Sequence, residues 1–193
     1  MSENTAHLAD LVIVLDCQNG SAEAMEKLVA RWQKRLWQHA YHLTGNAEAA
    51  WEVTQESWLG IVRGLPRLTD PEKFKPWAFR IVTNKSNDWI RRKLRFPQSG
   101  QTDCDPVPAA DTRGEREQSS DLRHVLRKLK PQSQMILSLY YFEQFSVHQV
   151  AEVLGIAVGT VKSRLHTARN EFRKLWEADR SDSPSSRSVP EDL

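Results

Sequence analysis

The chain has 193 residues, of which 39% are hydrophobic and 27% charged, and its 27 basic and 25 acidic side chains leave a net charge of +2. This length and composition suit a soluble, mostly folded protein of one domain or two small ones. The two cysteines, Cys17 and Cys104, belong to no metal-ligand or CxxC spacing. We therefore expect two reduced thiols, with neither a disulfide nor a metal site.

The N-terminal segment, residues 1–19, lacks the basic and apolar pattern of a signal peptide. Its longest apolar run, LVIVL at residues 11–15, is too short to cross a membrane. We therefore expect a cytoplasmic protein that does not insert into a membrane.

Residues 20–95 are expected to form an N-terminal helical domain. Apolar side chains at three- and four-residue steps predict one helix over residues 21–43 and a second that Asn46 caps. Asp70-Pro71 predicts a further helix start, because aspartate suits the cap and proline suits the first helical position. The apolar stripe that follows consists of Phe74, Trp77, Ile81 and Val82, and another helical run, SNDWIRRKLR, ends the domain.

The small net charge hides two basic blocks. Residues 80–95 hold six basic and one acidic side chain, and residues 119–176 hold nine basic and four acidic ones. Between them, residues 96–118 hold two basic and five acidic side chains, and three prolines and two glycines there predict a flexible acidic linker. Contact with a polyanion at two places would explain this pattern, and so would solvated helix faces. The tail, residues 177–193, is rich in Ser, Pro and Asp and is expected to be disordered.

The second basic block coincides with an expected C-terminal helical domain, residues 119–176. Ser146 and Gln149 match a capping box at the start of a short helix that stops at Gly155. A last helix is expected over residues 158–176. Because clear strand alternation is scarce throughout, the sequence predicts an all-α protein of two small helical domains joined by the linker.

Ala151, Gly155 and Val161, at spacings of four and six residues, form the skeleton of a helix-turn-helix. The small alanine lets the second helix pack closely, and the glycine permits the positive φ of the turn. The second helix is then free to enter a DNA major groove with its first turns. Its outward positions would be Thr160, Lys162, Ser163, His166, Thr167 and Arg169. For His166, the alternative is a solvated surface histidine. For Lys162 and Arg169, the alternative is a contact with a DNA phosphate, which carries no sequence information.

The stretch QSQMILSLYYFEQFSVHQVAEVLGIAVGTVKSRLHTARNEFRKL resembles the fourth region of bacterial RNA polymerase sigma factors, and GTVKSRLHTAR is similar to the small extracytoplasmic-function (ECF) group. EVTQESWLGIVRGL and FKPWAFRIVTNKSNDWIRRKLR resemble the second region of the same group. The resemblance covers roughly residues 20–176 with two motifs in the right order. It implies a transcription initiation factor of the sigma-70 family, which binds core RNA polymerase, recognises −10 and −35 promoter elements and helps to melt the DNA.

The resemblance also implies roles for residues of the N-terminal domain. Glu52, Gln55 and Glu56 match the helix that docks on core polymerase, where carboxylates and an amide suit a basic partner helix. The residues that match the part that binds and opens the −10 element are Asn84, Lys85, Trp89, Arg91 and Arg92. Asn84 would lie at the lip of a pocket for a flipped base, and the three cations would hold phosphates. Trp89 fits either a core position or a DNA contact.

In the C-terminal domain, the residues that match the −35-reading positions are Lys162, Ser163, Arg164, His166, Thr167 and Arg169. Three positions depart from the family pattern. Thr167 stands where members often carry arginine, and Ala157 stands where a capping Ser or Pro is common. Trp51 precedes the docking residues in place of a more usual acidic-leucine pattern.

An anti-sigma partner is a further implication of the resemblance, whereas no cofactor, metal, small-molecule substrate or catalytic residue is expected. A stand-alone helix-turn-helix regulator is the alternative from another class. Such a regulator would need a ligand-binding or phosphoacceptor domain. The N-terminal half shows no βαβ pattern, which counts against this alternative. An enzyme is disfavoured, because the chain has no nucleophile motif, metal-ligand spacing or phosphate loop.

Overall fold

A computed structural model places residues 3–95, 122 and 124–182 of the chain. The predicted linker, residues 96–118, and the end of the predicted tail, residues 183–193, lie outside the described residues. Every secondary-structure element in the described part is a helix, which confirms the all-α class. None of the helices described is both long and apolar enough to cross a bilayer.

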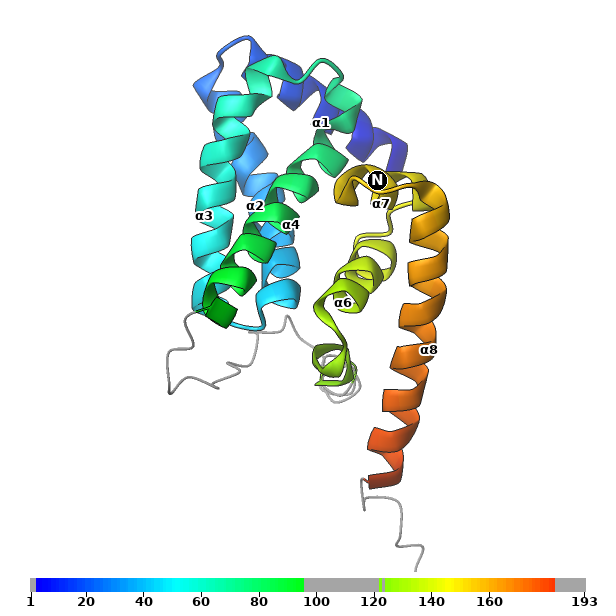
Figure 1. The fold of residues 1–193 in the computed structure, drawn as a ribbon. Helices are drawn as coiled ribbons and strands as arrows, with labels where there is room; N and C mark the ends of the chain where they lie inside the picture. The colour runs from blue at the N-terminus through cyan, green and yellow to red at the C-terminus, as the bar shows by residue number, and fades with distance from the viewer. Residues whose placement is uncertain (1–2, 96–121, 123, 183–193) are drawn as a thin grey trace, which may run out of the picture.

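The N-terminal half forms a helical bundle, shown from blue to green in Figure 1. Its elements are α1 (Glu3–Gln18), α2 (Ala22–Thr44), α3 (Ala47–Gly64) and α4 (Phe74–Arg95), with two short 3₁₀ turns, η1 (Leu65–Arg67) and η2 (Pro71–Lys73), before α4. Two predicted caps are confirmed: Asn46 Oδ1 accepts a hydrogen bond from the Ala49 amide at 2.8 Å, and Asp70 Oδ1 accepts one from the Glu72 amide at 3.0 Å. The apolar stripe after Asp70 and the run SNDWIRRKLR belong to one helix rather than two.

Helix α1 is an element that the sequence pattern does not predict, because its apolar residues are nearly consecutive and do not form a single stripe. Val14 and Cys17 are buried against the bundle, and this burial raises the pKa of the Cys17 thiol. The Asp10 carboxylate accepts a hydrogen bond from Trp32 Nε1 of α2 at 3.3 Å. Side-chain contacts with α2 therefore hold in place a segment whose own pattern is ambiguous.

The C-terminal half contains α6 (Pro131–Leu137), which continues as the π-helical turn η3 (Ser138–Phe142), then α7 (Val147–Leu154) and α8 (Val158–Asp182). The predicted capping box of α7 is confirmed. Ser146 Oγ accepts from the Gln149 amide at 3.2 Å, and Gln149 Oε1 accepts from the Ser146 amide at 2.9 Å.

Helix α8 is longer than predicted. It extends to Asp182 rather than Trp176, so the expectation of a disordered tail is wrong for residues 177–182. One reason is tertiary: the Lys128 ammonium donates to Asp179 of this extension at 2.5 Å, across 51 positions of sequence. The composition of residues 177–182 favours disorder, but the contact with the distant Lys128 favours the helix.

Gly155 ends α7 in the left-handed region, at φ +65°, as the turn requires. We expect Gly155→Ala to lower the free energy of unfolding by about 1–2 kcal/mol, because a Cβ is strained at this φ. The matched control is Gly159→Ala in the first turn of α8, where an added Cβ meets no atom within 4 Å and the φ is not positive. The control should be neutral or slightly stabilising. Denaturation followed by circular dichroism measures both, and equal effects would contradict the role of the turn.

The two halves share one hydrophobic core. Helix α4 packs against α7 and α2 packs against α6, and Figure 1 shows the C-terminal helices beside α4. Phe79 of α4 meets Phe145, the residue before the α7 cap, edge to face with ring centroids 5.2 Å apart. The sequence predicts both sets of helices but says nothing of their mutual placement.

Candidate nucleic-acid interface

A helix-turn-helix made of α7 and the first half of α8 positions the recognition helix. Val150 and Ala151 of α7 and Val161 and Leu165 of α8 are buried, as the spacing predicts. Burial of this stripe orients α8 and leaves its opposite face exposed.

Of the seven side chains of α8 that the sequence singles out, Thr160 is partly buried rather than exposed. The other six are exposed: Lys162, Ser163, Arg164, His166, Thr167 and Arg169. The helix backbone already satisfies two of the hydroxyls. Ser163 Oγ donates to the Thr160 carbonyl at 3.0 Å, and Thr167 Oγ1 donates to the Ser163 carbonyl at 3.1 Å. Their positions are therefore defined before any DNA is bound.

Asn170, which is partly buried, also lies on this side of α8, although the sequence did not single it out. Because an α-helix turns about 100° per residue, Ser163, His166 and Asn170 stand near the middle of the exposed face. Asn170 Nδ2 lies 3.4 Å from His166 Nδ1. An asparagine amide can bind adenine with two hydrogen bonds in the major groove. The spacing of seven and four residues from Ser163 and His166 is the signal that could have found it.

Arg164 and Arg169, the two arginines among these exposed side chains, have different surroundings. Arg164 lines a crevice with the start of α6 and with α4. The Arg169 guanidinium instead lies over the rings of Tyr140 and Tyr141, 5.4 Å and 5.6 Å from their centroids. The structure thus separates Arg169 from Arg164 and directs it toward an aromatic surface.

The side chains expected at the −10 element lie along the second half of α4. Asn84, Arg91 and Arg92 are exposed. Lys85 is engaged, because its Nζ donates to the Glu56 carboxylate of α3 at 2.9 Å. Trp89 is half-buried against the core, and the Lys93 ammonium lies 5.1 Å from its ring centroid. Three of the five side chains are therefore exposed, and two are engaged with neighbouring residues.

The ion pair between Lys85 and Glu56 joins two residues for which the sequence suggests different partners, DNA for one and polymerase for the other. Each side chain is partly exposed, 41% for Lys85 and 36% for Glu56. Such a pair contributes up to about 1 kcal/mol, so it orients both side chains without preventing either from changing partner.

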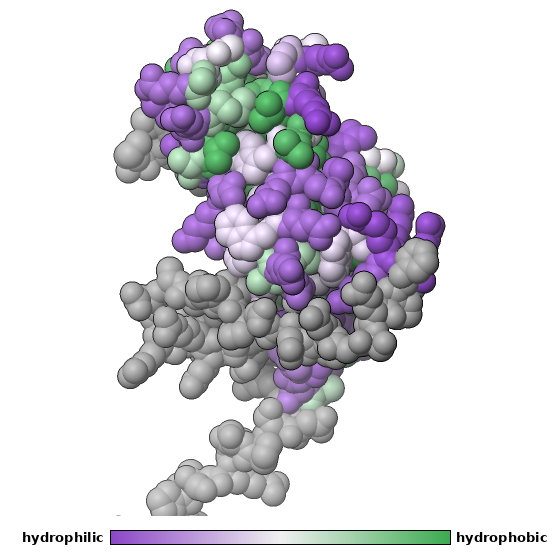
Figure 2. All heavy atoms as spheres, turned by 90° about the vertical axis from the view of Figure 1, so that its left-hand side faces the viewer, coloured by the Kyte–Doolittle hydropathy of each residue, from purple (hydrophilic) through white to green (hydrophobic). Residues whose placement is uncertain are grey.

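Helix α3 presents an exposed stripe on the face opposite its buried side. The stripe consists of Trp51, Glu52, Gln55, Leu59 and Val62. Leu59 is 58% exposed and Val62 is 47% exposed, although both are aliphatic. Figure 2, which faces the α3 side, shows apolar side chains gathered in the upper part of this face among hydrophilic ones. Glu52 and Gln55 were predicted from the sequence, and Trp51 was noted beside them. Leu59 and Val62 were not predicted, although their three- and four-residue spacing continues the same stripe.

The described residues include several surfaces that suit binding. No group of three or more His, Cys, Asp or Glu side chains among them could hold a metal ion. Burial lowers the pKa of His39 to about 3, with His42 nearby adding to the effect. This imidazole lies between Thr83 and Ser138 where the two halves meet, and it is fully buried. Exposed cations, amides and an apolar stripe fit contacts with a polyanion and with a protein.

Comparisons with known proteins agree with the division into two halves. The model of sigma-70 region 2 matches residues 28–96, and that of sigma-70 region 4 matches residues 119–172. The ECF RNA polymerase sigma factor SigE of Mycolicibacterium smegmatis is 32% identical over 77% of this chain, which spans 60% of that relative. SigL of Mycobacterium tuberculosis, another ECF RNA polymerase sigma factor, is 34% identical over 72% of this chain and 80% of its own length. Among solved structures, CnrH in complex with the cytosolic domain of CnrY is similar at a TM-score of 0.68 and 27% identity, over 89% of this chain and 99% of CnrH.

Proposed function

Since this chain belongs to the ECF group of sigma-70 family RNA polymerase sigma factors, we propose that it is a transcription initiation factor whose separate surfaces bind the polymerase, the −10 element and the −35 element. The observation that carries the proposal is the exposed face of α8, which a helix-turn-helix holds ready for a major groove. The exposed cations of α4 are the second DNA surface.

At the −35 element, Ser163, His166 and Asn170 read base edges, and Lys162 and Arg164 flank them as cations for phosphates or guanine. At the −10 element, Asn84 contacts a base that leaves the duplex. The cations Arg91 and Arg92 hold the freed strand, and Lys85 joins them after it leaves Glu56. Two weak DNA contacts on one chain act together once the polymerase holds both halves.

Core polymerase binds the α3 stripe. Its carboxylate and amide, Glu52 and Gln55, suit a basic partner, and Trp51, Leu59 and Val62 supply apolar area that the isolated chain leaves in water. An apolar centre with a polar rim is the usual anatomy of a protein interface.

The same family membership supports three further parts of the proposal. An anti-sigma protein restrains the chain, and the similar chain CnrH, which is solved in complex with the cytosolic domain of CnrY, supports a protein partner of this kind. The chain acts in the cytoplasm, where a bacterium transcribes its DNA. It performs no chemical step itself, and the polymerase supplies the catalysis.

Transcription in vitro tests the proposal. Adding the purified chain to core RNA polymerase should give transcripts from a defined set of promoters in a genomic library. The absence of transcripts from every promoter, together with a failure to co-purify with core polymerase, would refute it. A stand-alone regulator would bind DNA under these conditions without joining the polymerase.

Lys162→Ala tests the assignment of α8. We expect about a tenfold loss of promoter use, equivalent to about 1.4 kcal/mol, and a salt dependence of DNA binding that is smaller by about one phosphate contact. Lys34→Ala removes an equal charge from an exposed position of α2 and serves as the control. If promoters that differ only in the −35 element respond to Lys162→Ala as they do to the control, Lys162 does not contact that element.

A further inference from the structure

A crevice of about 300 Å³ lies where the second half of α4 meets the start of α6 and the second turn of α8, and Leu154 at the end of α7 also lines it. Both halves of the chain therefore contribute to it. Small-molecule sites commonly have volumes of about 300–1,000 Å³, with mostly apolar walls and a few convergent polar groups. The crevice thus has the size of a site for a small organic molecule.

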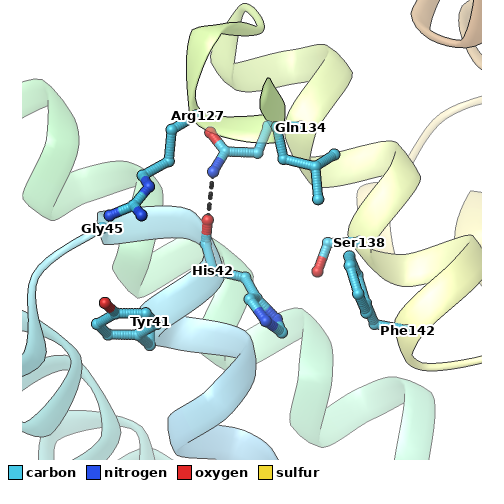
Figure 3. Close-up of a pocket in the computed structure, with 8 residues that line it drawn as sticks. Tyr41, His42, Gly45, Arg127, Gln134, Ser138 and Phe142 are labelled. Carbon is cyan, nitrogen blue, oxygen red and sulfur yellow. Dashed lines mark hydrogen bonds between the residues drawn. The ribbon is translucent and has the colours of Figure 1, made fainter. Parts of the chain in front are cut away.

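A second cavity between the halves, shown in Figure 3, is too small for such a ligand. Its volume is about 20 Å³, which is enough for a single water molecule. Gln134 of α6 is directed at α2 there and donates a hydrogen bond to the backbone carbonyl of His42. This contact is therefore filled by the protein itself.

Two arginines from different halves line the crevice, Arg91 of α4 and Arg164 of α8. Both are exposed, and within the described part of the chain neither forms an ion pair. None of the residues that line the crevice is acidic. Guanidinium groups that share a cavity repel each other, and an anion bound between them removes this repulsion. Because the guanidinium fork matches the geometry of phosphate oxygens, phosphate groups suit this pair.

Side-chain amides supply directional hydrogen bonds in the same crevice. Asn84 and Asn87 lie about one turn apart on α4, and Gln132 reaches the crevice from α6. Asn87 Nδ2 lies 4.0 Å from the thioether sulfur of Met135, a weak acceptor that a better one readily replaces. An amide offers both a donor and an acceptor, and it can bind the edge of a nucleobase with two hydrogen bonds. The amides therefore suit a base.

Apolar side chains from three helices form the remaining surface of the crevice. Ile90 of α4 and Leu154 of α7 are partly buried, and Met135 of α6 is 7% exposed. A flat ring can pack against such side chains, and methionine adapts its shape to what it contacts. An inorganic anion would leave this apolar surface in water, whereas a nucleotide covers it. The apolar part of the crevice therefore favours a nucleotide over free phosphate.

We propose that the crevice is a binding site for a nucleoside diphosphate. The base packs on the apolar side chains and meets the amides of Asn84 and Asn87, and the phosphates lie between the guanidiniums of Arg91 and Arg164. Three of these residues, Asn84, Arg91 and Arg164, are also assigned to promoter contacts, so a bound nucleotide competes with promoter DNA for them. This consequence rests on the proposed function, whereas the binding site itself does not.

Isothermal titration calorimetry with ADP and GDP tests the site on the full chain. A buffer of about 0.15 M salt screens long-range attraction between exposed charges. Pyrophosphate and adenosine are the probes for the two parts of the ligand. Arg91→Ala and Arg164→Ala each remove one guanidinium of the crevice, and Arg173→Ala is the matched control, because Arg173 is exposed on α8 but does not line the crevice. All three side chains are exposed, so the variants should fold, and circular dichroism checks this.

We expect ADP or GDP to bind at least about tenfold more tightly than pyrophosphate or adenosine. Each crevice variant should weaken this binding about tenfold, and the control should change it less than about twofold. If pyrophosphate binds as tightly as the nucleotides, the crevice attracts an adventitious ion only, and the proposal is wrong. Equal losses for Arg164→Ala and Arg173→Ala, or no binding of either nucleotide at about 1 mM, would also overturn it. The titrations use neither polymerase nor promoter, so the transcription assay tests the proposed function separately.

Discussion

Replacing Phe79 with alanine is expected to lower the free energy of unfolding by about 3–5 kcal/mol, the usual cost of removing a phenyl ring from a core. Phe79 is fully buried, and its ring centroid lies 5.0 Å from that of His39 and 5.2 Å from that of Phe145. These neighbours belong to the two different halves of the chain. The cavity would therefore weaken both the N-terminal bundle and its packing against the C-terminal half.

Urea denaturation followed by circular dichroism and tryptophan fluorescence measures this loss. Leu94→Ala is the control, since Leu94 is 75% exposed on the same helix and its truncation should change stability by no more than about 0.5 kcal/mol. Similar losses for the two variants would mean that Phe79 is not at the centre of the core.

Acid is expected to destabilise the chain through His39. The pKa of this imidazole is about 3 in the folded chain, mainly because burial disfavours its charged form. Its ordinary value is 6.5, so between pH 6.5 and pH 3 the unfolded chain takes up a proton that the folded chain does not. The free energy of unfolding then falls as the pH falls, by about 2 kcal/mol between about pH 7.5 and about pH 5, and is unaffected by His39 at higher pH.

Glu143 acts in the opposite sense. Burial raises the pKa of its carboxyl, although Arg35 and Lys75 counteract part of this effect, so acid relieves the cost of keeping it ionised. The effect of His39 is therefore read as a difference between the wild type and His39→Gln, which keeps a hydrogen-bonding side chain that does not titrate.

Denaturation curves at a series of pH values should show a flatter pH dependence for His39→Gln, by about 2 kcal/mol over the same interval. The carboxylates and the other histidines are common to both chains and cancel in the comparison. Parallel curves would show that protonation of His39 is not linked to folding.

The helices and their ends could be predicted from the sequence. Asn46, Asp70 and Ser146 each accept the backbone hydrogen bond that the cap predicts, and Gly155 takes the positive φ that the turn needs. The exposed face of α8 also follows from periodicity alone, because burial of one stripe exposes the other. These features depend on residues within a few positions of one another.

Other features of the candidate site depend on contacts between distant residues. The ion pair of Glu56 with Lys85 links positions 29 apart, and the one of Arg35 with Glu143 links positions 108 apart. No pattern in the neighbouring sequence indicates that Arg169 lies over two tyrosines, that α1 is a helix, or that α8 continues to Asp182.

The sequence by itself therefore determined the helical class, the helix-turn-helix and the side chains that can meet DNA, since periodicity and capping act over one or two turns. Only the tertiary structure decided which of those side chains are exposed, which are paired, and that residues of the two proposed DNA surfaces line a common crevice. The physical reason is that burial and pairing depend on how the two halves pack. That packing is a sum of many weak contacts, and no short stretch of the chain specifies it.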